Sequence, residues 1–276
     1  MDVGIGLPST IRGTTGAQIV EWARRAEARG FSSLGTIDRI VYANYEPLIA
    51  LAAAAAVTER IKLATTILIA PLRVSGAMLA KQAASVDALS GGRLVLGVAV
   101  GGREDDFEVA GAEFGARGKA FDRMLGEWEE IWDGEAIGPA AHPSVIIGGS
   151  SGAAFRRSAE HDGWIMGGGS PDQFREGLAK LEEAWQAAGR EGKPRTMALS
   201  YYALGDGAKA AADGYLKDYY GFLGDVSQMV ADSAAKDAET VRAYAQGFEA
   251  AGCDELIFFP TSADAAQVDM LAEAAL

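Results

Sequence analysis

The sequence predicts a single α/β domain in which eight parallel strands close into a (β/α)8 TIM barrel, with inserted loops after strands four and seven. Short apolar segments alternate with helical segments along all 276 residues, which is typical of parallel strands joined by helical crossovers. The first four strands begin about thirty residues apart, and eight such repeats fit the length of a closed barrel. No Pro/Ser-rich linker divides the chain, so residues 1–276 are expected to form one domain.

An open, doubly wound sheet is the main alternative. A dinucleotide-binding sheet of that kind carries a glycine-rich fingerprint after its first strand. The corresponding stretch here, Gly6-Leu7-Pro8-Ser9, lacks it. The barrel is therefore the preferred fold.

The first four repeats are regular. The expected strands are Val3–Leu7, Phe31–Ile37, Lys62–Ile67 and Arg93–Val98. The expected helices are Gly16–Arg29, a segment from Pro47 to near Thr58, and a segment whose face is marked by Leu79, Ala83, Val86 and Leu89. Gly30 suits the left-handed end of the first helix, and Ser90-Gly91-Gly92 closes the third.

The later repeats are less regular. Arg103–Arg117 has no clear periodicity and is expected to be a long loop, followed by a helix over Phe121–Trp132. Tyr219–Ala235 is aromatic and aperiodic and is treated as the second insertion. The remaining expected strands are Val145–Ile147, Gly163–Met166, Thr196–Ala203 and Glu255–Phe259. The remaining expected helices are Ala153–His161, Ser170–Ala188, one from about Ala208, Asp237–Ala250 and Ala265–Ala275.

Composition narrows the function classes. The formal net charge of −13 disfavours nucleic acid and anionic membranes as partners. Cys253 is the single cysteine, and His142 and His161 are the only histidines, so neither a disulfide nor a metal centre is expected. The N-terminus lacks the regions of a signal peptide, and the alanine-rich run Leu48–Val57 is too short to span a bilayer. We expect a cytoplasmic protein.

Two glycine clusters stand out between Ser144 and Ser170. A strand ends in Gly148-Gly149-Ser150-Ser151, and the next ends in Gly167-Gly168-Gly169-Ser170, each followed by a helix. Unpaired N–H groups and the positive end of the helix dipole make such a position suitable for an oxyanion. The alternative is a pair of ordinary glycine turns. The matched pair favours a phosphate cradle.

The other strand ends carry further candidates. The second strand is followed by Asp38 and Arg39, which could instead pair with each other or cap the next helix. Arg73 follows the third strand, where a guanidinium suits an anionic ligand. Arg103 follows the fourth, ahead of an acidic run, Glu104-Asp105-Asp106, that is typical of a solvated loop or a helix cap.

The seventh strand ends in two tyrosines. By strand alternation one of Tyr201 and Tyr202 faces inward, where core packing is its expected role. No histidine or lysine stands at a strand end. Since these are the commonest general base and the Schiff-base residue, the pattern favours a bound phosphorylated cofactor that supplies the chemistry itself.

Several motifs resemble those of the luciferase-like flavin-dependent monooxygenase superfamily. The similar stretches are Ala28-Arg-Gly-Phe-Ser-Ser-Leu, Thr58-Glu-Arg-Ile-Lys-Leu-Ala-Thr-Thr-Ile-Leu, Ala80 to Val98 with its core Ser90-Gly-Gly-Arg-Leu-Val-Leu-Gly, Ile147-Gly-Gly-Ser-Ser and Asp162-Gly-Trp. The resemblance covers nearly the whole chain. It implies a barrel that binds reduced FMN or the deazaflavin coenzyme F-420.

The resemblance also assigns roles. Thr66 corresponds to the isoalloxazine contact of the third strand, where the family often has a cis peptide, and Val100 and Gly101 correspond to ring or ribityl contacts. The phosphate cradle corresponds to Gly148, Gly149, Ser150, Ser151, Gly167 and Gly168. Asp38-Arg39 stands where many deazaflavin enzymes have Asp-His. Because arginine is a poor proton donor, this departure favours FMN over F-420.

We therefore expect an FMN-dependent oxidoreductase, a monooxygenase acting with dioxygen on a small organic substrate, with a separate reductase supplying reduced flavin. Arg39, Arg73 and Arg103 are its candidate rim charges, and a homodimer through the helices after strands two and three is expected from the family. The alternatives are an F-420-dependent hydride-transfer enzyme, a flavin-storing protein without turnover, and a phosphosugar isomerase or lyase that uses Asp38 or Glu104 as base.

Overall fold

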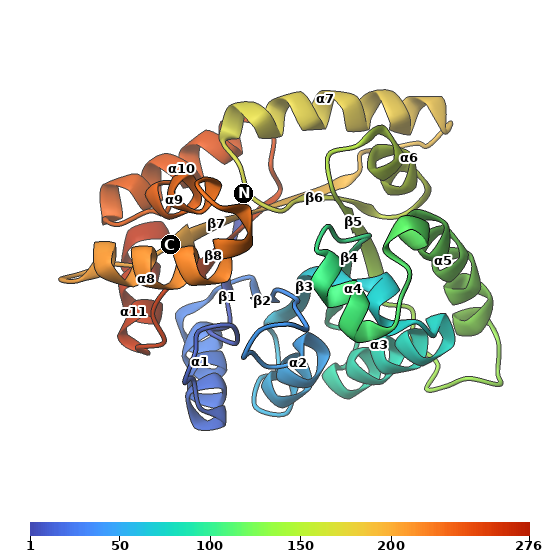
Figure 1. Ribbon diagram of the computed structural model, residues 1–276, viewed down its shortest axis with the longest axis horizontal. Coiled ribbons are helices and arrows are strands. Elements are labelled where there is room, and N and C mark those ends of the chain that lie inside the picture. Colours follow the sequence, from blue (N-terminus) through green and yellow to red (C-terminus); the bar gives the residue numbers. More distant parts are fainter.

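Eight parallel strands form a closed barrel in sequence order, β1 to β8 (Figure 1), in a computed structural model that describes residues 1–276. The strands are β1 (Asp2–Gly6), β2 (Ser33–Thr36), β3 (Lys62–Ile69), β4 (Leu94–Ala99), β5 (Ser144–Gly148), β6 (Gly163–Met166), β7 (Arg195–Tyr202) and β8 (Glu255–Pro260). The predicted TIM barrel is confirmed.

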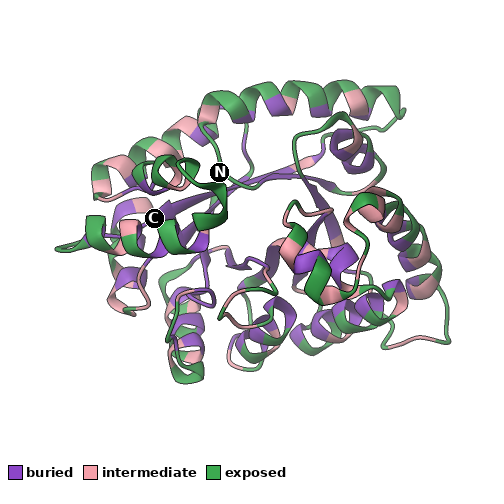
Figure 2. Ribbon diagram, in the orientation of Figure 1, coloured by how far each residue is buried: buried purple, intermediate pink, exposed green.

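Helices surround the barrel, with exposed outer faces and buried inner faces (Figure 2). They are α1 (Gly16–Arg29), α2 (Pro47–Ala55), α3 (Gly76–Ser90), α4 (Glu104–Ala110), α5 (Arg117–Asp133), α6 (Gly152–Glu160), α7 (Pro171–Ala187), α8 (Ala208–Tyr219), α9 (Val226–Asp232), α10 (Ala238–Ala250) and α11 (Ala266–Ala275). Three 3-10 turns complete the set: η1 (Ala70–Arg73), η2 (Phe114–Ala116) and η3 (Gly221–Leu223). None of the helices combines the length and the apolar character that crossing a membrane requires.

The two expected insertions are more ordered than the sequence suggested. The segment predicted as a loop, Arg103–Arg117, contains α4 and η2. The second insertion contains η3 and α9 and ends with a bridge between Ala235 and Tyr202. Helices of about two turns show no readable period, so the loop prediction for Arg103–Arg117 was wrong. Three acidic residues in the first turn of α4 stabilise it through the helix dipole.

The barrel interior is filled unevenly. Large side chains come from β7 and β8, while β1 and β2 contribute glycine. A Cβ atom at Gly6 would lie 2.3 Å from the Phe259 ring, and one at Gly35 would lie 2.8 Å from it. The aromatic ring therefore needs both glycines, and the interior is a packed core.

A buried carboxylate closes the N-terminal end of the barrel. Glu255 is 1% exposed and accepts hydrogen bonds from Ser32 and Ser33, each at 2.6 Å, and from Arg195 at 2.6 Å. Arg93, in the Ser90-Gly-Gly-Arg-Leu-Val-Leu-Gly stretch, also lies at this end and donates to the carbonyls of Thr58 and Ile61. These contacts stabilise the end of the barrel opposite the glycine clusters.

Candidate functional site

The first glycine cluster lies between the end of β5 and the start of α6. Gly149, Ser150 and Ser151 are exposed, and Gly149 has a φ of 116°. Ser151 caps α6 by accepting a hydrogen bond from the Ala154 N–H at 3.2 Å. The backbone N–H groups from Gly149 to Ala153 have no acceptor within the protein. This is the arrangement that an oxyanion needs.

The second cluster, between β6 and α7, is also exposed but is differently equipped. Gly168 has a φ of 116°, and the N–H groups of Gly167 and Gly168 have no acceptor. The helix itself offers little, because a capping box joins the Ser170 N–H to Gln173 and the Gln173 N–H back to Ser170. Pro171 has no N–H, and Asp172 adds a negative charge. The helix dipole is therefore less available to an anion here than at α6.

Gly148 allows β5 to lie close to the Ile67 side chain of β3 at the C-terminal end of the barrel, which we call the mouth. A Cβ atom there would lie 2.2 Å from Cδ1 of Ile67 on β3, and one at Gly167 would lie 3.5 Å from the same atom. Ile67 therefore forms an apolar floor that both glycine clusters approach. The sequence analysis did not single it out, because its role depends on distant strands.

The indole of Trp164 fixes the first cluster from below. This fully buried residue on β6 donates a hydrogen bond from Nε1 to the Gly149 carbonyl at 2.7 Å. The bond gives the Gly149 carbonyl a partner and ties this turn to β6. The Asp-Gly-Trp motif of the family resemblance thus has a physical role in shaping this turn.

Asp38 and Arg39 neither pair with each other nor cap α2, whose cap is Glu46. The Asp38 carboxylate is buried, accepts the Ile69 N–H at 2.8 Å, and forms an ion pair with Arg73. Arg73 also contacts Glu46 at 2.7 Å. Burial raises the pKa of Asp38, while the Arg73 guanidinium opposes that rise. Arg73 is thus occupied by two carboxylates rather than free at the rim.

Arg39 and Arg103 lie beside the second insertion. Arg39 donates to the carbonyls of Tyr219 and Val41, and its guanidinium lies 4.6 Å from the Tyr42 ring centroid. Arg103 contacts Asp105 and Asp106. The acidic run predicted as a solvated loop or cap is therefore partly structural.

Asp106 connects two of the loops at the C-terminal end of the barrel, a role that the sequence analysis did not predict. It is 3% exposed and accepts the N–H groups of Ile40 at 3.0 Å and Val41 at 2.6 Å. These bonds tie the segment after β4 to the segment after β2. The spacing Arg103-x-x-Asp106 within a short helix is the signal that could have indicated it.

The ends of β3 and β4 meet at the mouth. Thr66 is buried, and its hydroxyl donates to the Thr36 carbonyl at 3.3 Å. The β3–β4 register shifts between Thr65 and Leu68, which is the kind of irregularity found beside active sites. The cis peptide expected in the family at this position is not present, since the cis bond of the chain is Gly138–Pro139.

Val100 and Gly101 follow β4 directly. Val100 is half-buried against the main core, and Gly101 has a φ of 76° with Ile69 only 2.5 Å from where its Cβ would be. Arg117, at the start of α5, donates from Nε to the Gly101 carbonyl at 3.2 Å. Arg117 was missed as a site residue because its partner lies sixteen positions earlier in the chain.

A cavity of about 270 Å³ opens between the second glycine cluster and the end of β7. Tyr201 faces inward as predicted, and its hydroxyl lies 2.7 Å from that of Tyr220. Both line the cavity with Gly167 and Gly168. Burial raises the pKa of each phenol, so both remain protonated hydrogen-bonding groups at neutral pH.

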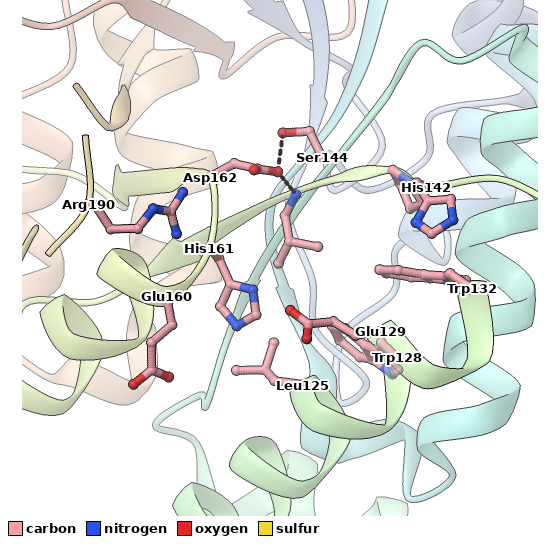
Figure 3. A pocket seen from close by; sticks show the side chains of 12 residues that line it. Leu125, Trp128, Glu129, Trp132, His142, Ser144, Glu160, His161, Asp162 and Arg190 are labelled. Atoms are coloured by element: carbon pink, nitrogen blue, oxygen red, sulfur yellow. Dashed lines mark hydrogen bonds between the residues drawn. The ribbon is translucent and has the colours of Figure 1, made fainter. Parts of the chain in front are cut away.

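A second cavity, of about 500 Å³, lies where β5 and β6 begin (Figure 3). It contains both histidines, and Figure 3 shows His161 near Glu129 and His142 beside Trp132. Burial lowers the pKa of His161, which keeps it neutral. Because the histidines line the opposite end of the barrel, neither is a base for the glycine-rich mouth.

Comparison with known proteins identifies a family. Residues 1–258 match the luciferase-like monooxygenase family. An uncharacterized protein of Mycobacterium tuberculosis (strain ATCC 25618 / H37Rv) is 31% identical over 206 residues, which cover 61% of this chain and 71% of that protein. A second one from the same strain is 32% identical over 182 residues, covering 58% of this chain and 63% of that protein.

Two solved structures have the same fold. A secondary alcohol dehydrogenase that depends on coenzyme F-420, solved with an F-420–acetone adduct, has a TM-score of 0.83 at 17% identity, covering 99% of this chain and 97% of that one. The oxygenating constituent of 3,6-diketocamphane monooxygenase from Pseudomonas putida, solved with FMN, has a TM-score of 0.75 at 16% identity, covering 100% and 97%.

Proposed function

The chain belongs to the luciferase-like monooxygenase family, and on that premise we propose that it is an FMN-dependent oxidoreductase, a monooxygenase that uses reduced FMN and dioxygen on a small organic substrate. The family supports oxidoreductase chemistry with a flavin or with F-420. The choice of FMN and of dioxygen is our proposal. The residues at the C-terminal end of the barrel support this choice.

The first glycine cluster carries the proposal. The N–H groups of Gly149–Ala153 have no acceptor, residues 149–152 are exposed, and the segment lies at the start of a helix of nine residues. A phosphate monoester would supply the acceptors and the negative charge that this helix end favours. In a chain of net charge −13, such local donors are the means by which an anionic cofactor can be held.

The other mouth residues suit a supporting role. Reduced flavin, when bound, supplies the electrons that activate dioxygen. Ile67 offers an apolar floor, and Tyr201 and Tyr220 offer protonated hydroxyls beside the 270 Å³ cavity. Together these groups would orient the ligands and exclude water.

Proton transfer distinguishes the two cofactors. Hydride transfer between F-420 and an alcohol or carbonyl calls for a nearby acid or base. By the family resemblance, Arg39 stands where many deazaflavin enzymes have histidine, and Asp38 is engaged by Arg73 and the Ile69 N–H. These contacts support FMN.

Absorption titrations with FMN and with F-420, followed by oxygen-electrode measurements with a flavin reductase, test the proposal. We expect FMN to bind more tightly and oxygen uptake to depend on the protein once substrate is supplied. Tighter binding of F-420 would contradict the choice of cofactor. Tight FMN binding without oxygen uptake across a substrate panel would support a storage protein instead.

We also propose a homodimer through α2 and α3, which lie side by side in Figure 1. Ile49, Met78 and Leu89 on these helices are 66%, 56% and 74% exposed, and a dimer would cover such apolar side chains. Sedimentation velocity is expected to show a dimer that Met78→Glu weakens. A wild-type monomer at micromolar concentration would contradict this.

A further inference from the structure

The guanidinium groups around the mouth are not equally neutralised. Arg12 pairs with Asp218, Arg73 with Asp38 and Glu46, and Arg103 with Asp105 and Asp106. Arg39 has no carboxylate partner, since its terminal nitrogens donate to backbone carbonyls. Arg39 is therefore the only one of these four guanidiniums without a direct carboxylate partner.

Two buried guanidinium nitrogens in this region have no hydrogen-bond acceptor. They are Nε of Arg39 and Nη1 of Arg103. A buried donor without an acceptor is costly and uncommon. Two such atoms on neighbouring arginines indicate that an acceptor belongs between them.

The ring of Phe222 now occupies the space beside both groups. Its centroid lies 3.9 Å from Cζ of Arg103 and 5.7 Å from Cζ of Arg39. An aromatic face attracts cations but accepts directed hydrogen bonds poorly compared with an oxyanion. Phe222 therefore compensates part of the charge and leaves the two N–H groups unpaired.

The electrostatics point the same way. Burial, and then the charge of Arg103, lower the pKa of Arg39, while Asp105 and Asp106 partly oppose this lowering. An anion placed between the two guanidiniums would add attraction to both and offset the repulsion that remains.

The cover formed by Phe222 is easily displaced. Phe222 is 50% exposed and Leu223 is 40% exposed. They lie in the short turn η3, which ends at Gly224 with a φ of 59°. Few buried contacts hold this turn, so its local opening is expected to require little free energy.

We propose that Arg39 and Arg103 form a carboxylate subsite for the substrate, and that Phe222 covers this subsite when it is empty. This inference rests on the proposed function, because it assigns the substrate class of the same mouth. Three aromatic rings lie beside the Arg39 guanidinium: the centroids of Tyr42, Tyr219 and Phe222 are 4.6, 4.9 and 5.7 Å from its Cζ. The substrate class is accordingly an aromatic or otherwise apolar carboxylate.

Calorimetric titration with benzoate and with its neutral analogue benzamide tests the proposal. We expect benzoate to bind to the wild-type protein and benzamide to bind about tenfold more weakly or not at all, as loss of a charge-assisted hydrogen bond implies. Arg39→Gln should weaken benzoate by about tenfold, and Arg39→Lys, which keeps the charge without the planar fork, should weaken it less.

Arg190→Gln is the matched control. Arg190 also stacks on an aromatic ring, at 4.3 Å from Trp185, and donates to a backbone carbonyl, but it lies at the other end of the barrel. We expect its benzoate affinity to equal that of the wild type. Equal binding of benzoate and benzamide, or unchanged benzoate affinity in a folded Arg39→Gln protein, would overturn the proposal.

A titration of benzoate in the presence of saturating FMN separates this inference from the proposed function. We expect FMN to leave benzoate affinity unchanged or to raise it. Competition between the two would show that the arginine pair holds the cofactor phosphate and would overturn the substrate assignment. If FMN fails to bind while benzoate binds through Arg39, the subsite stands and the choice of cofactor fails.

Discussion

The two glycine clusters at the barrel mouth look alike in sequence and differ in chemistry. Both follow a strand, both open a helix, and both contain a glycine with a φ of 116°. At α6 the N–H groups of Ser151, Gly152 and Ala153 have no acceptor, whereas at α7 Gln173 accepts the Ser170 N–H, Pro171 has no N–H, and Asp172 adds a negative charge. Two similar motifs can thus have different capacities for an anion, because capping decides which N–H groups remain available.

The largest loss of FMN affinity is expected when a side chain is placed in the first glycine cluster. Gly149→Val should lower FMN affinity about a hundredfold or more, since the side chain would occupy the place of the oxyanion at a φ that valine disfavours. Gly168→Val should lower it about tenfold or less. Absorption titration measures both.

Gly189→Val controls for backbone strain. Gly189 has a φ of 68° and open space around it, at the end of α7 away from the mouth. Its FMN affinity should match that of the wild type. If Gly168→Val lowers FMN affinity as much as Gly149→Val does, the claim that the two clusters differ in anion binding is contradicted.

A smaller effect is expected at the helix caps. Ser151→Ala and Ser170→Ala should each lower the free energy of unfolding by about 1 kcal/mol, the usual cost of losing a serine cap. Only Ser151→Ala should also lower FMN affinity, by about fivefold, because it alters the helix end that faces the phosphate. Urea denaturation and FMN titration measure the two quantities, and equal loss of affinity in both variants would argue for a shared cradle.

The smallest effect is expected at Asp172. This side chain is 86% exposed and pairs with Arg175. With the phosphate at α6, Asp172→Asn should change FMN affinity by less than about twofold, as expected for a screened surface charge. A tenfold gain would place the phosphate at α7 instead.

Much of the barrel could be predicted from the sequence, because strand and helix segments alternate along the chain and glycines mark the ends of helices. Gly30 and Gly91 both end helices in the left-handed conformation that their positions indicated. The capping box at Ser170 was also visible in the sequence. Its consequence for anion binding depends on which N–H groups of the two clusters stay unpaired in the folded chain.

The ion pairs could not be predicted in the same way. Asp38 pairs with Arg73, 35 positions away, and leaves the adjacent Arg39 without a carboxylate. Phe222 reaches Arg103 from an insertion whose short helices show no period. Such partners are set by where loops meet at the mouth, which local pattern does not encode.

The central claim is that the N–H groups at the start of α6 hold the phosphate of FMN. Comparing the affinities of FMN and riboflavin, which lacks the phosphate, for the wild-type and Gly149→Val proteins tests it most directly. The account predicts that the wild type prefers FMN strongly and that Gly149→Val binds the two flavins almost equally. A preference for FMN that survives intact in Gly149→Val would contradict it.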